Sequence, residues 1–264
     1  MARLDCSSAH AVLASFGEAL GRDLHDIEDA LRRLDPSDCP TGVDPEAHLA
    51  ARFRAAHGLS PADVPFSGAV FHHGTRTLDP SAYCRRGLLP LPEIVDDLWD
   101  GLYSLIASDV TRAEWLDVRR QMEFGGRGRN AHLYRLRLAH VRDHGPFGFL
   151  VRDQAIHAPA PSVVYLRMPE TVEDIVIEAE AVLAGLKLRD RFREAAVPCV
   201  VSFEVPCPAW AVGPGIVYAF RALTQGDVGG LSWSFDAGGA RIPPDRIIRV
   251  DAEERAPAAL RRDQ

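Results

Sequence analysis

His73, Gly74 and Thr75 carry the clearest chemical signal in this chain. They close an apolar, β-favouring run that starts at Ala69, and a short helix that stops at Gly87 follows them. An imidazole can hydrogen-bond a hydroxyl, and a glycine lets a ligand come close to the backbone because it has no side chain. The order of these residues predicts that the end of one strand can hold a planar carboxamide and a ribose together.

The run His73–Thr77, with the Gly-Leu that ends the short helix, resembles the first motif of the His-Tyr-Glu branch of ADP-ribosyltransferases. That branch includes the poly(ADP-ribose) polymerases and several bacterial toxins that modify DNA or RNA. By this resemblance His73 would hydrogen-bond a ribose hydroxyl of NAD, and the backbone of Gly74 would hold the nicotinamide carboxamide. Thr75 and Arg76 would line the adenosine side, where Arg76 would meet a phosphate. NAD is thus the expected cofactor, used as a substrate.

Two further segments resemble later motifs of the same family. The run 163–166, Val-Val-Tyr-Leu, resembles a strand that ends in a tyrosine, which implies that Tyr165 stacks on the nicotinamide ring. The segment 242–250 resembles the closing strand of these proteins. An alternative for the second motif is the segment 145–150, with Phe149 in the place of the tyrosine.

The sequence departs from the family where a catalytic glutamate is expected, just before the final hairpin. Ser232 stands at this place, and the nearest carboxylates are those of Asp227 and Asp236. Asp227 follows a stretch expected to be flexible, so we take it as the first candidate for the missing carboxylate. A serine can hydrogen-bond a ribose but supplies no negative charge to a cationic sugar. Tyr165, Asp227 and Ser232 are therefore the candidate catalytic residues.

The resemblance implies a mono-ADP-ribosyltransferase-like enzyme that cleaves the N-glycosidic bond of NAD and transfers ADP-ribose. The acceptor is an unidentified macromolecule or small molecule. An alternative is a catalytically inactive module that binds NAD or ADP-ribose, because the glutamate is missing. A weaker alternative is an RNA 2′-phosphotransferase-like enzyme, which resembles the same fold family.

Composition narrows the class of protein. The chain has 264 residues, 47% of them hydrophobic and 25% charged, with a net charge of −7. This favours a globular protein, and the negative charge disfavours nucleic-acid binding by the surface as a whole. No apolar stretch of about 18 residues and no signal-peptide core occur, so we expect a cytoplasmic protein without membrane contact. The five cysteines are scattered, which indicates neither a disulfide framework nor a zinc site.

Two smaller features point to local binding. Arg127 and Arg129 lie in a glycine-rich loop and could contact the phosphates of a nucleic acid. His140 and His144 are four apart on an expected helix, but no third metal ligand stands at a suitable spacing. We therefore expect no metal site.

The pattern of elements predicts an α+β fold. We expect a helical N-terminal segment (1–62), an ADP-ribosyltransferase-like domain (63–252) and a flexible tail (253–264). The resemblance implies a split β-sheet core, and the helices within about 92–145 would then be an insertion. The strands expected in the second half of the chain are 199–205, 216–220, 231–235 and 246–250.

Overall fold

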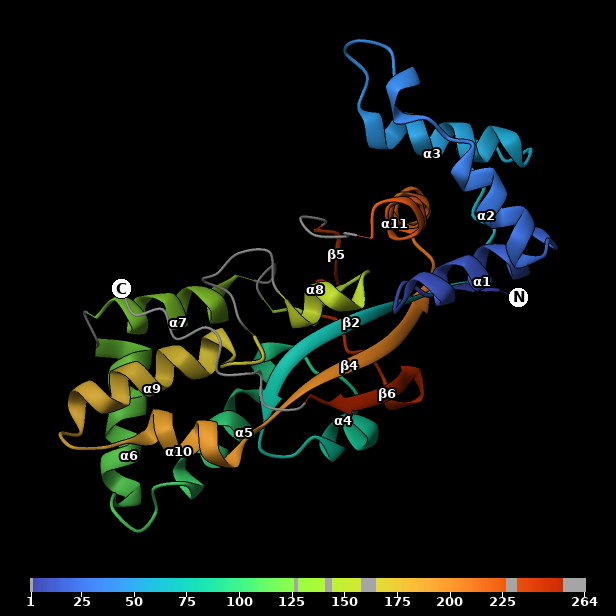
Figure 1. The fold of residues 1–264 in the computed structure, drawn as a ribbon. Coiled ribbons are helices and arrows are strands. Elements are labelled where there is room, and N and C mark those ends of the chain that lie inside the picture. The colour runs from blue at the N-terminus through green and yellow to red at the C-terminus, as the bar shows by residue number, and fades with distance from the viewer. Residues whose placement is uncertain (1, 126–127, 141–143, 158–164, 227–231, 254–264) are drawn as a thin grey trace. The chain divides into compact units, whose positions relative to one another are not determined.

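The computed structural model describes residues 2–125, 128–140, 144–157, 165–226 and 232–253 (Figure 1). It confirms the α+β class. The chain forms two compact units, both discontinuous along the sequence. Unit 1 contains Met1–His72, Gly148–Pro159 and Ser202–Phe235. Unit 2 contains His73–Phe147, Ala160–Val201 and Asp236–Gln264. Residues 1–62 thus share unit 1 with two later segments of the chain.

The described strands form one open six-stranded sheet with the order β5-β3-β2-β4-β6, and β1 pairs with β2 outside this path. Strand β1 runs parallel to β2, and β3 runs antiparallel to it with His72 opposite Phe149. The predicted strands at 199–205 and 246–250 are confirmed as β4 and β6. The strand bounds are Arg3–Leu4 (β1), Gly68–Thr77 (β2), Phe147–Phe149 (β3), Val197–Pro206 (β4), Ser234–Asp236 (β5) and Ile247–Ala252 (β6).

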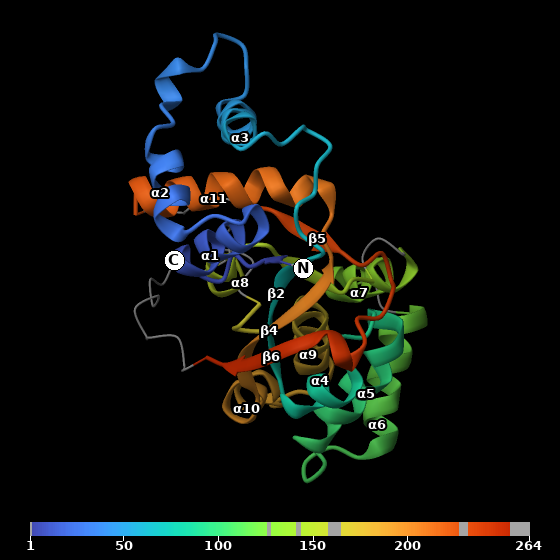
Figure 2. The same ribbon diagram turned by 90° about the vertical axis from the view of Figure 1, so that its right-hand side faces the viewer.

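In unit 1, helix α11 packs on α1, α2 and α3 (Figure 2). Asp44 caps α3 with Pro45 in its first turn, and Gly58 follows its end with a φ of 68°, as the sequence predicts. Gly215 allows α11 to lie against Leu4, since a Cβ there would come within 2.9 Å of the leucine side chain. The bounds of these helices are Ala9–Leu20 (α1), Leu24–Arg32 (α2), Pro45–Ala56 (α3), Arg152–Ile156 (α8) and Val212–Thr224 (α11), with short 3₁₀ turns at Pro36–Asp38 and Ala209–Ala211.

The prediction of a strand at 216–220 is wrong, because these residues lie in the middle of α11. All five side chains of this run are buried. A short, continuous apolar run is compatible with a buried strand and with a helix that is buried on most sides, and periodicity alone does not separate them. Because all five residues of the run are buried, their sequence shows no pattern that distinguishes a helix from a strand.

In unit 2, a group of helices encloses a hydrophobic core that contains Trp99, Trp115 and Tyr134. The Trp99 indole donates to the Tyr134 hydroxyl over 2.9 Å, and the Trp115 indole donates to the Trp99 carbonyl over 3.1 Å. The predicted capping box of Thr111 and Glu114 starts α6. The helix bounds are Ser81–Arg86 (α4), Leu91–Ser104 (α5), Arg112–Arg120 (α6), Arg129–Ala139 (α7), Glu170–Val182 (α9) and Leu188–Ala195 (α10), with a π-helical turn at Gln121–Gly125 and a 3₁₀ turn at Pro244–Arg246.

Helix α7 ends at Ala139, so the prediction that His140 and His144 share a helix is wrong. The ring of His144 contacts the Leu138 carbonyl instead, over 3.0 Å. Within the described residues, no three His, Cys, Asp or Glu side chains gather as a metal ion would require. Among the same residues, every helix is too short or too polar to cross a lipid bilayer.

Candidate functional site

Strand β2 carries the residues that the sequence singles out. Side chains alternate between the two faces of a strand, so His73, Thr75 and Thr77 lie on one face while Gly74 and Arg76 lie on the other. We call the first the His73 face and the second the Arg76 face. All five residues belong to unit 2.

The imidazole of His73 is half-buried and held by a backbone carbonyl. Its Nδ1 lies 2.8 Å from the carbonyl oxygen of Phe147, which can only accept a hydrogen bond, so Nδ1 carries the proton. Burial lowers the pKa of His73, and the bond to Phe147 acts in the opposite direction with less effect. The neutral form of the ring is therefore favoured, and in that form its Nε2 is a hydrogen-bond acceptor.

Gly74 is buried at the last position where β3 accompanies β2. The pairing of His72 with Phe149 puts Phe147, the first residue of β3, opposite Gly74. Beyond this point no described strand borders β2 on the β3 side. The pairing of β2 with β3 therefore ends at Gly74, the residue that follows His73.

On the His73 face, Thr75 and Thr77 contact helix α4. The hydroxyl of Tyr83 hydrogen-bonds both threonine side chains, and burial raises the pKa of Tyr83 to about 12. Thr75 is 6% exposed. These threonines therefore anchor α4. No local pattern in the sequence marks Tyr83 as their partner.

Arg76 points away from the His73 face and binds two backbone carbonyls. Its Nη1 donates to the Leu166 carbonyl over 3.2 Å, and its Nη2 donates to the Arg193 carbonyl over 2.6 Å. The resemblance assigns this guanidinium to a phosphate of NAD. In the structure, the Arg76 guanidinium instead binds the turn at 165–167 and helix α10. It lies on the other face of β2 from His73.

Tyr165 lies in a turn, half-buried, and the rest of the strand expected before it (161–164) lies outside the described residues. Burial raises the pKa of its hydroxyl, Glu170 raises it further and Arg137 opposes them. These charged neighbours belong to α7 and α9. The structure therefore places Tyr165 against the helices of unit 2, and no described contact joins it to His73.

The alternative second motif lies on β3. Phe149 stands opposite His72 within unit 1, and the first residue of the same strand supplies the carbonyl that holds His73 within unit 2. Strand β3 is thus the neighbour of β2 in both units. The segment 145–150 pairs with the strand of His73, whereas the turn at Tyr165 contacts the same strand through the bond from Arg76 to the Leu166 carbonyl.

The candidate carboxylates do not form a described cluster with His73. Asp227 lies outside the described residues, and Ser232 is exposed in unit 1, two residues before β5. Asp236 is exposed in unit 2 at the end of β5, where its carboxylate accepts a hydrogen bond of 2.8 Å from the Gly238 amide. Of the two loop arginines, Arg127 lies outside the described residues and Arg129 is exposed as the first residue of α7.

Two hollows within the described residues lie elsewhere. One, of about 350 Å³, opens in unit 1 between α2 and α3. The other, of about 400 Å³, opens in unit 2 and is lined by Arg86, Leu89, Glu93 and Arg241. Neither is lined by His73 or Gly74.

The sequence could not reveal the contact that fixes the state of His73, because a backbone carbonyl has no signature in the residue type. It did identify the histidine and the glycine, from their position at the end of an apolar run. Comparisons with protein-family models, with curated proteins and with solved structures found no match to this chain.

Proposed function

We propose that this protein binds NAD at the end of β2, through His73 and Gly74, and transfers its ADP-ribose to an acceptor. The observation that carries this proposal is the contact of His73 Nδ1 with the Phe147 carbonyl at 2.8 Å, which leaves Nε2 as the second ring nitrogen. Its Nε2 can accept a hydrogen bond from a ribose hydroxyl, which a protonated ring could not do. The buried glycine beside it offers backbone groups to a carboxamide.

The chemistry would break the bond between C1′ of the ribose and the nicotinamide nitrogen. Nicotinamide leaves with the electron pair and becomes neutral, and the sugar passes through an oxocarbenium-like state. The acceptor then attacks C1′ and loses a proton. Because the leaving group is good, the work of the protein is to orient the ribose and the ring. His73 would orient the ribose.

The resemblance assigns the aromatic partner of the nicotinamide to Tyr165, with Phe149 as the alternative. We also propose that the sheet has the split core of the ADP-ribosyltransferases. This proposal draws support from the end of β3 opposite Gly74, beyond which no described strand borders that side of β2.

A second candidate function is the binding of NAD or ADP-ribose without catalysis. It is favoured by Ser232, which stands where the family has a glutamate and supplies no negative charge to a cationic sugar. The two functions share the same site and differ only in turnover.

One experiment tests the site and separates the two functions. We expect NAD to bind in a calorimetric titration, and His73→Ala to weaken the binding at least about tenfold because a ribose contact is lost. The matched control is His132→Ala, an exposed histidine on α7, which should bind as the original chain does. A parallel assay of nicotinamide release then shows transfer or hydrolysis if release occurs, and binding alone if it does not. Equal NAD affinity in both variants would refute the site.

A further inference from the structure

A group of arginines lies on the Arg76 face of β2, in unit 2. Arg76 donates to the Leu166 carbonyl and to the Arg193 carbonyl, and so holds the turn at 165–167 and helix α10 against one point of the strand. That turn carries Arg167, and α10 carries Arg189 and Arg193.

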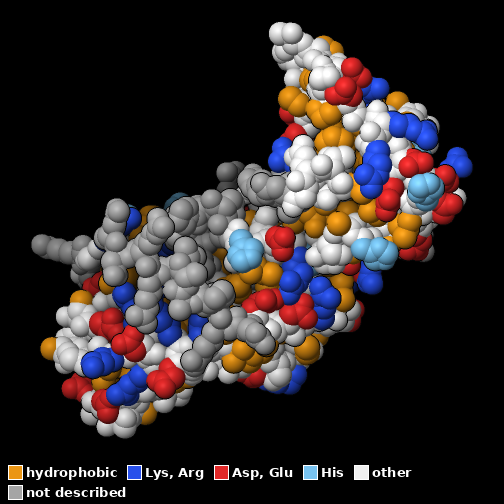
Figure 3. Space-filling model, viewed as in Figure 1, with side chains coloured by type: hydrophobic (Ala, Val, Ile, Leu, Met, Phe, Trp, Pro, Cys, Tyr) orange, Lys and Arg blue, Asp and Glu red, His pale blue; other side chains and the backbone are white. Residues whose placement is uncertain are grey.

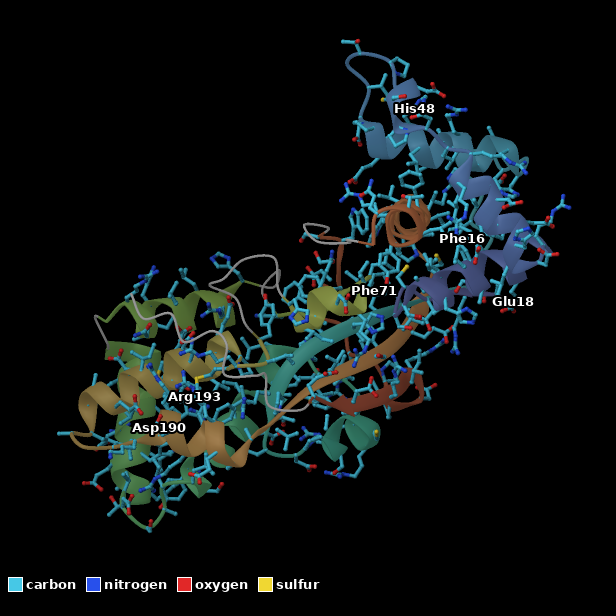
Figure 4. The ribbon with its side chains drawn as sticks, in the orientation of Figure 1. Phe16, Glu18, His48, Phe71, Asp190 and Arg193 are labelled. Atoms are coloured by element: carbon cyan, nitrogen blue, oxygen red, sulfur yellow. The ribbon has the colours of Figure 1, made fainter. Side chains whose placement is uncertain are left out.

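Arg189 and Arg193 lie one turn apart on α10, and Arg167 follows the residue whose carbonyl Arg76 binds together with that of Arg193. The pKa of the Arg193 guanidinium is lowered, first by burial and then by the charges of Arg167 and Arg189. Asp190, on the same helix (Figure 4), and Glu173 of α9 act in the opposite direction but with less effect. The positive neighbours therefore outweigh the negative ones at Arg193.

Two of the three guanidiniums have no anionic partner among the described residues. Arg189 is held by Glu180, whose carboxylate accepts from its backbone amide over 2.8 Å and lies 3.9 Å from its Nε. The Nε of Arg193 is buried and makes no hydrogen bond within the described part of the chain. Neither Arg193 nor the exposed Arg167 forms an ion pair there. Elsewhere on the visible surface of unit 2, acidic and basic side chains are interspersed (Figure 3).

We propose that Arg167 and Arg193 form a binding site for a phosphate-bearing ligand, with Arg189 beside them. Guanidinium groups present N–H donors in a fork that matches the oxygens of a phosphate, and gathering them costs free energy unless an anion joins them. Because Arg76 and His73 point to opposite faces of β2, this site is separate from the proposed NAD site. It does not rest on the proposed function.

A single phosphate group fits these observations better than a nucleic-acid backbone. The site offers two unpaired cations, which a phosphate dianion balances. A protein with a net charge of −7 repels a long polyanion unless a basic surface extends along it. The ligand would thus be inorganic phosphate or the phosphate of a small ester.

The test is a calorimetric titration of the full chain with inorganic phosphate. We expect saturable binding that the double variant Arg167→Gln/Arg193→Gln weakens at least about tenfold, because two charged hydrogen-bonding groups are lost. The matched control is Arg120→Gln on α6, where an exposed arginine is already paired with Asp117 at 2.8 Å. This control should change the affinity less than about twofold. No phosphate binding, or an equal loss in the control, overturns the proposal.

Thermal unfolding adds a readout that a purely structural role would not give. In phosphate-free buffer, Arg193→Gln should melt no lower than the original chain, because it relieves repulsion among like charges. When phosphate is added, the original chain should gain melting temperature and Arg193→Gln should not. A variant that melts lower without phosphate yet still gains from it contradicts the site.

Two further experiments identify the source of the phosphate and distinguish the phosphate site from the proposed NAD site. A single-stranded RNA decamer without a terminal phosphate should fail to displace inorganic phosphate. Tighter binding of that decamer than of phosphate, lost in the double variant, would overturn the assignment to a single phosphate group. His73→Ala should bind phosphate as the original chain does, so failure at the NAD site leaves this result unaffected.

Discussion

At the scale of single residues, a backbone contact decides what the side chain of His73 can do. The Phe147 carbonyl holds the proton on Nδ1, and burial favours the neutral ring. The same imidazole in water would be partly protonated near pH 6.5 and would exchange its proton between the two nitrogens. A fixed acceptor at Nε2 is therefore a property of this position.

Asp174 on α9 is a second residue whose charge is set by its surroundings. Its side chain is 6% exposed, and it faces Arg137 of α7. Burial raises the pKa of Asp174 to about 6, and the charges of Glu170 and Glu173 act in the same direction. Arg137 and Arg129 oppose this rise without cancelling it.

The raised pKa makes the stability depend on pH in a defined direction. The folded state binds the Asp174 proton more tightly than the unfolded chain, whose carboxyl has a pKa near 3.9. Stability should therefore fall as the pH rises from about 4 to about 6. Asp174→Asn cannot ionise, so we expect it to raise the free energy of unfolding by about 1 to 3 kcal/mol at pH 7.5, and by less at pH 5. Chemical denaturation at both pH values measures this.

The matched control is Glu170→Gln, which removes a more exposed carboxylate that lies 3.1 Å from the same arginine. It should change the stability little at either pH. A loss of stability in Asp174→Asn at pH 7.5 would mean that the ion pair with Arg137 outweighs the burial of the carboxylate.

At the scale of elements, β3 depends on a residue without a side chain. In unit 1, Gly148 lies against the ring of Phe203 and the Cβ of Phe71. Both residues belong to an aromatic cluster with Trp210 and Phe235. A Cβ at Gly148 would come within 2.8 Å of the Phe203 ring. The strand can approach this cluster only because position 148 is a glycine.

We therefore expect Gly148→Ala to lower the free energy of unfolding by about 1 to 3 kcal/mol, as overpacking of a core does. The control is Gly125→Ala, since a Cβ there would meet nothing within 4 Å. Denaturant titration of both variants checks this. A change in Gly148→Ala no larger than in the control would show that β3 can shift without cost.

Elements with local signals are the ones the sequence predicts well. The cap and the stop of α3, and the capping box of α6, depend on residues within a few positions of each other. The identity of α11 as a helix depends on burial by distant segments, which no local pattern records. For the same reason the sequence placed His73 and Gly74 at a strand end but could not supply their partners.

At the scale of the whole molecule, distant segments build each unit. The sequence predicts a boundary between a helical N-terminal segment (1–62) and the rest, where prolines stand at positions 61 and 65. In the structure, residues 1–72 form one unit with 148–159 and 202–235. Such an assembly follows from contacts between remote parts of the chain, which composition does not show. The placement of Arg76 against α10 and of Tyr165 near α7 and α9 has the same origin.

The most direct test of the account is the state of the His73 ring in solution, with and without NAD. Nitrogen NMR of the chain with ¹⁵N-labelled histidines should show one ring protonated on Nδ1 at pH 7, absent from His73→Ala. Its Nε2 signal should shift when NAD is added, while that of His132 stays in place. A His73 ring protonated on Nε2, or an Nε2 signal unmoved by saturating NAD, would contradict the account.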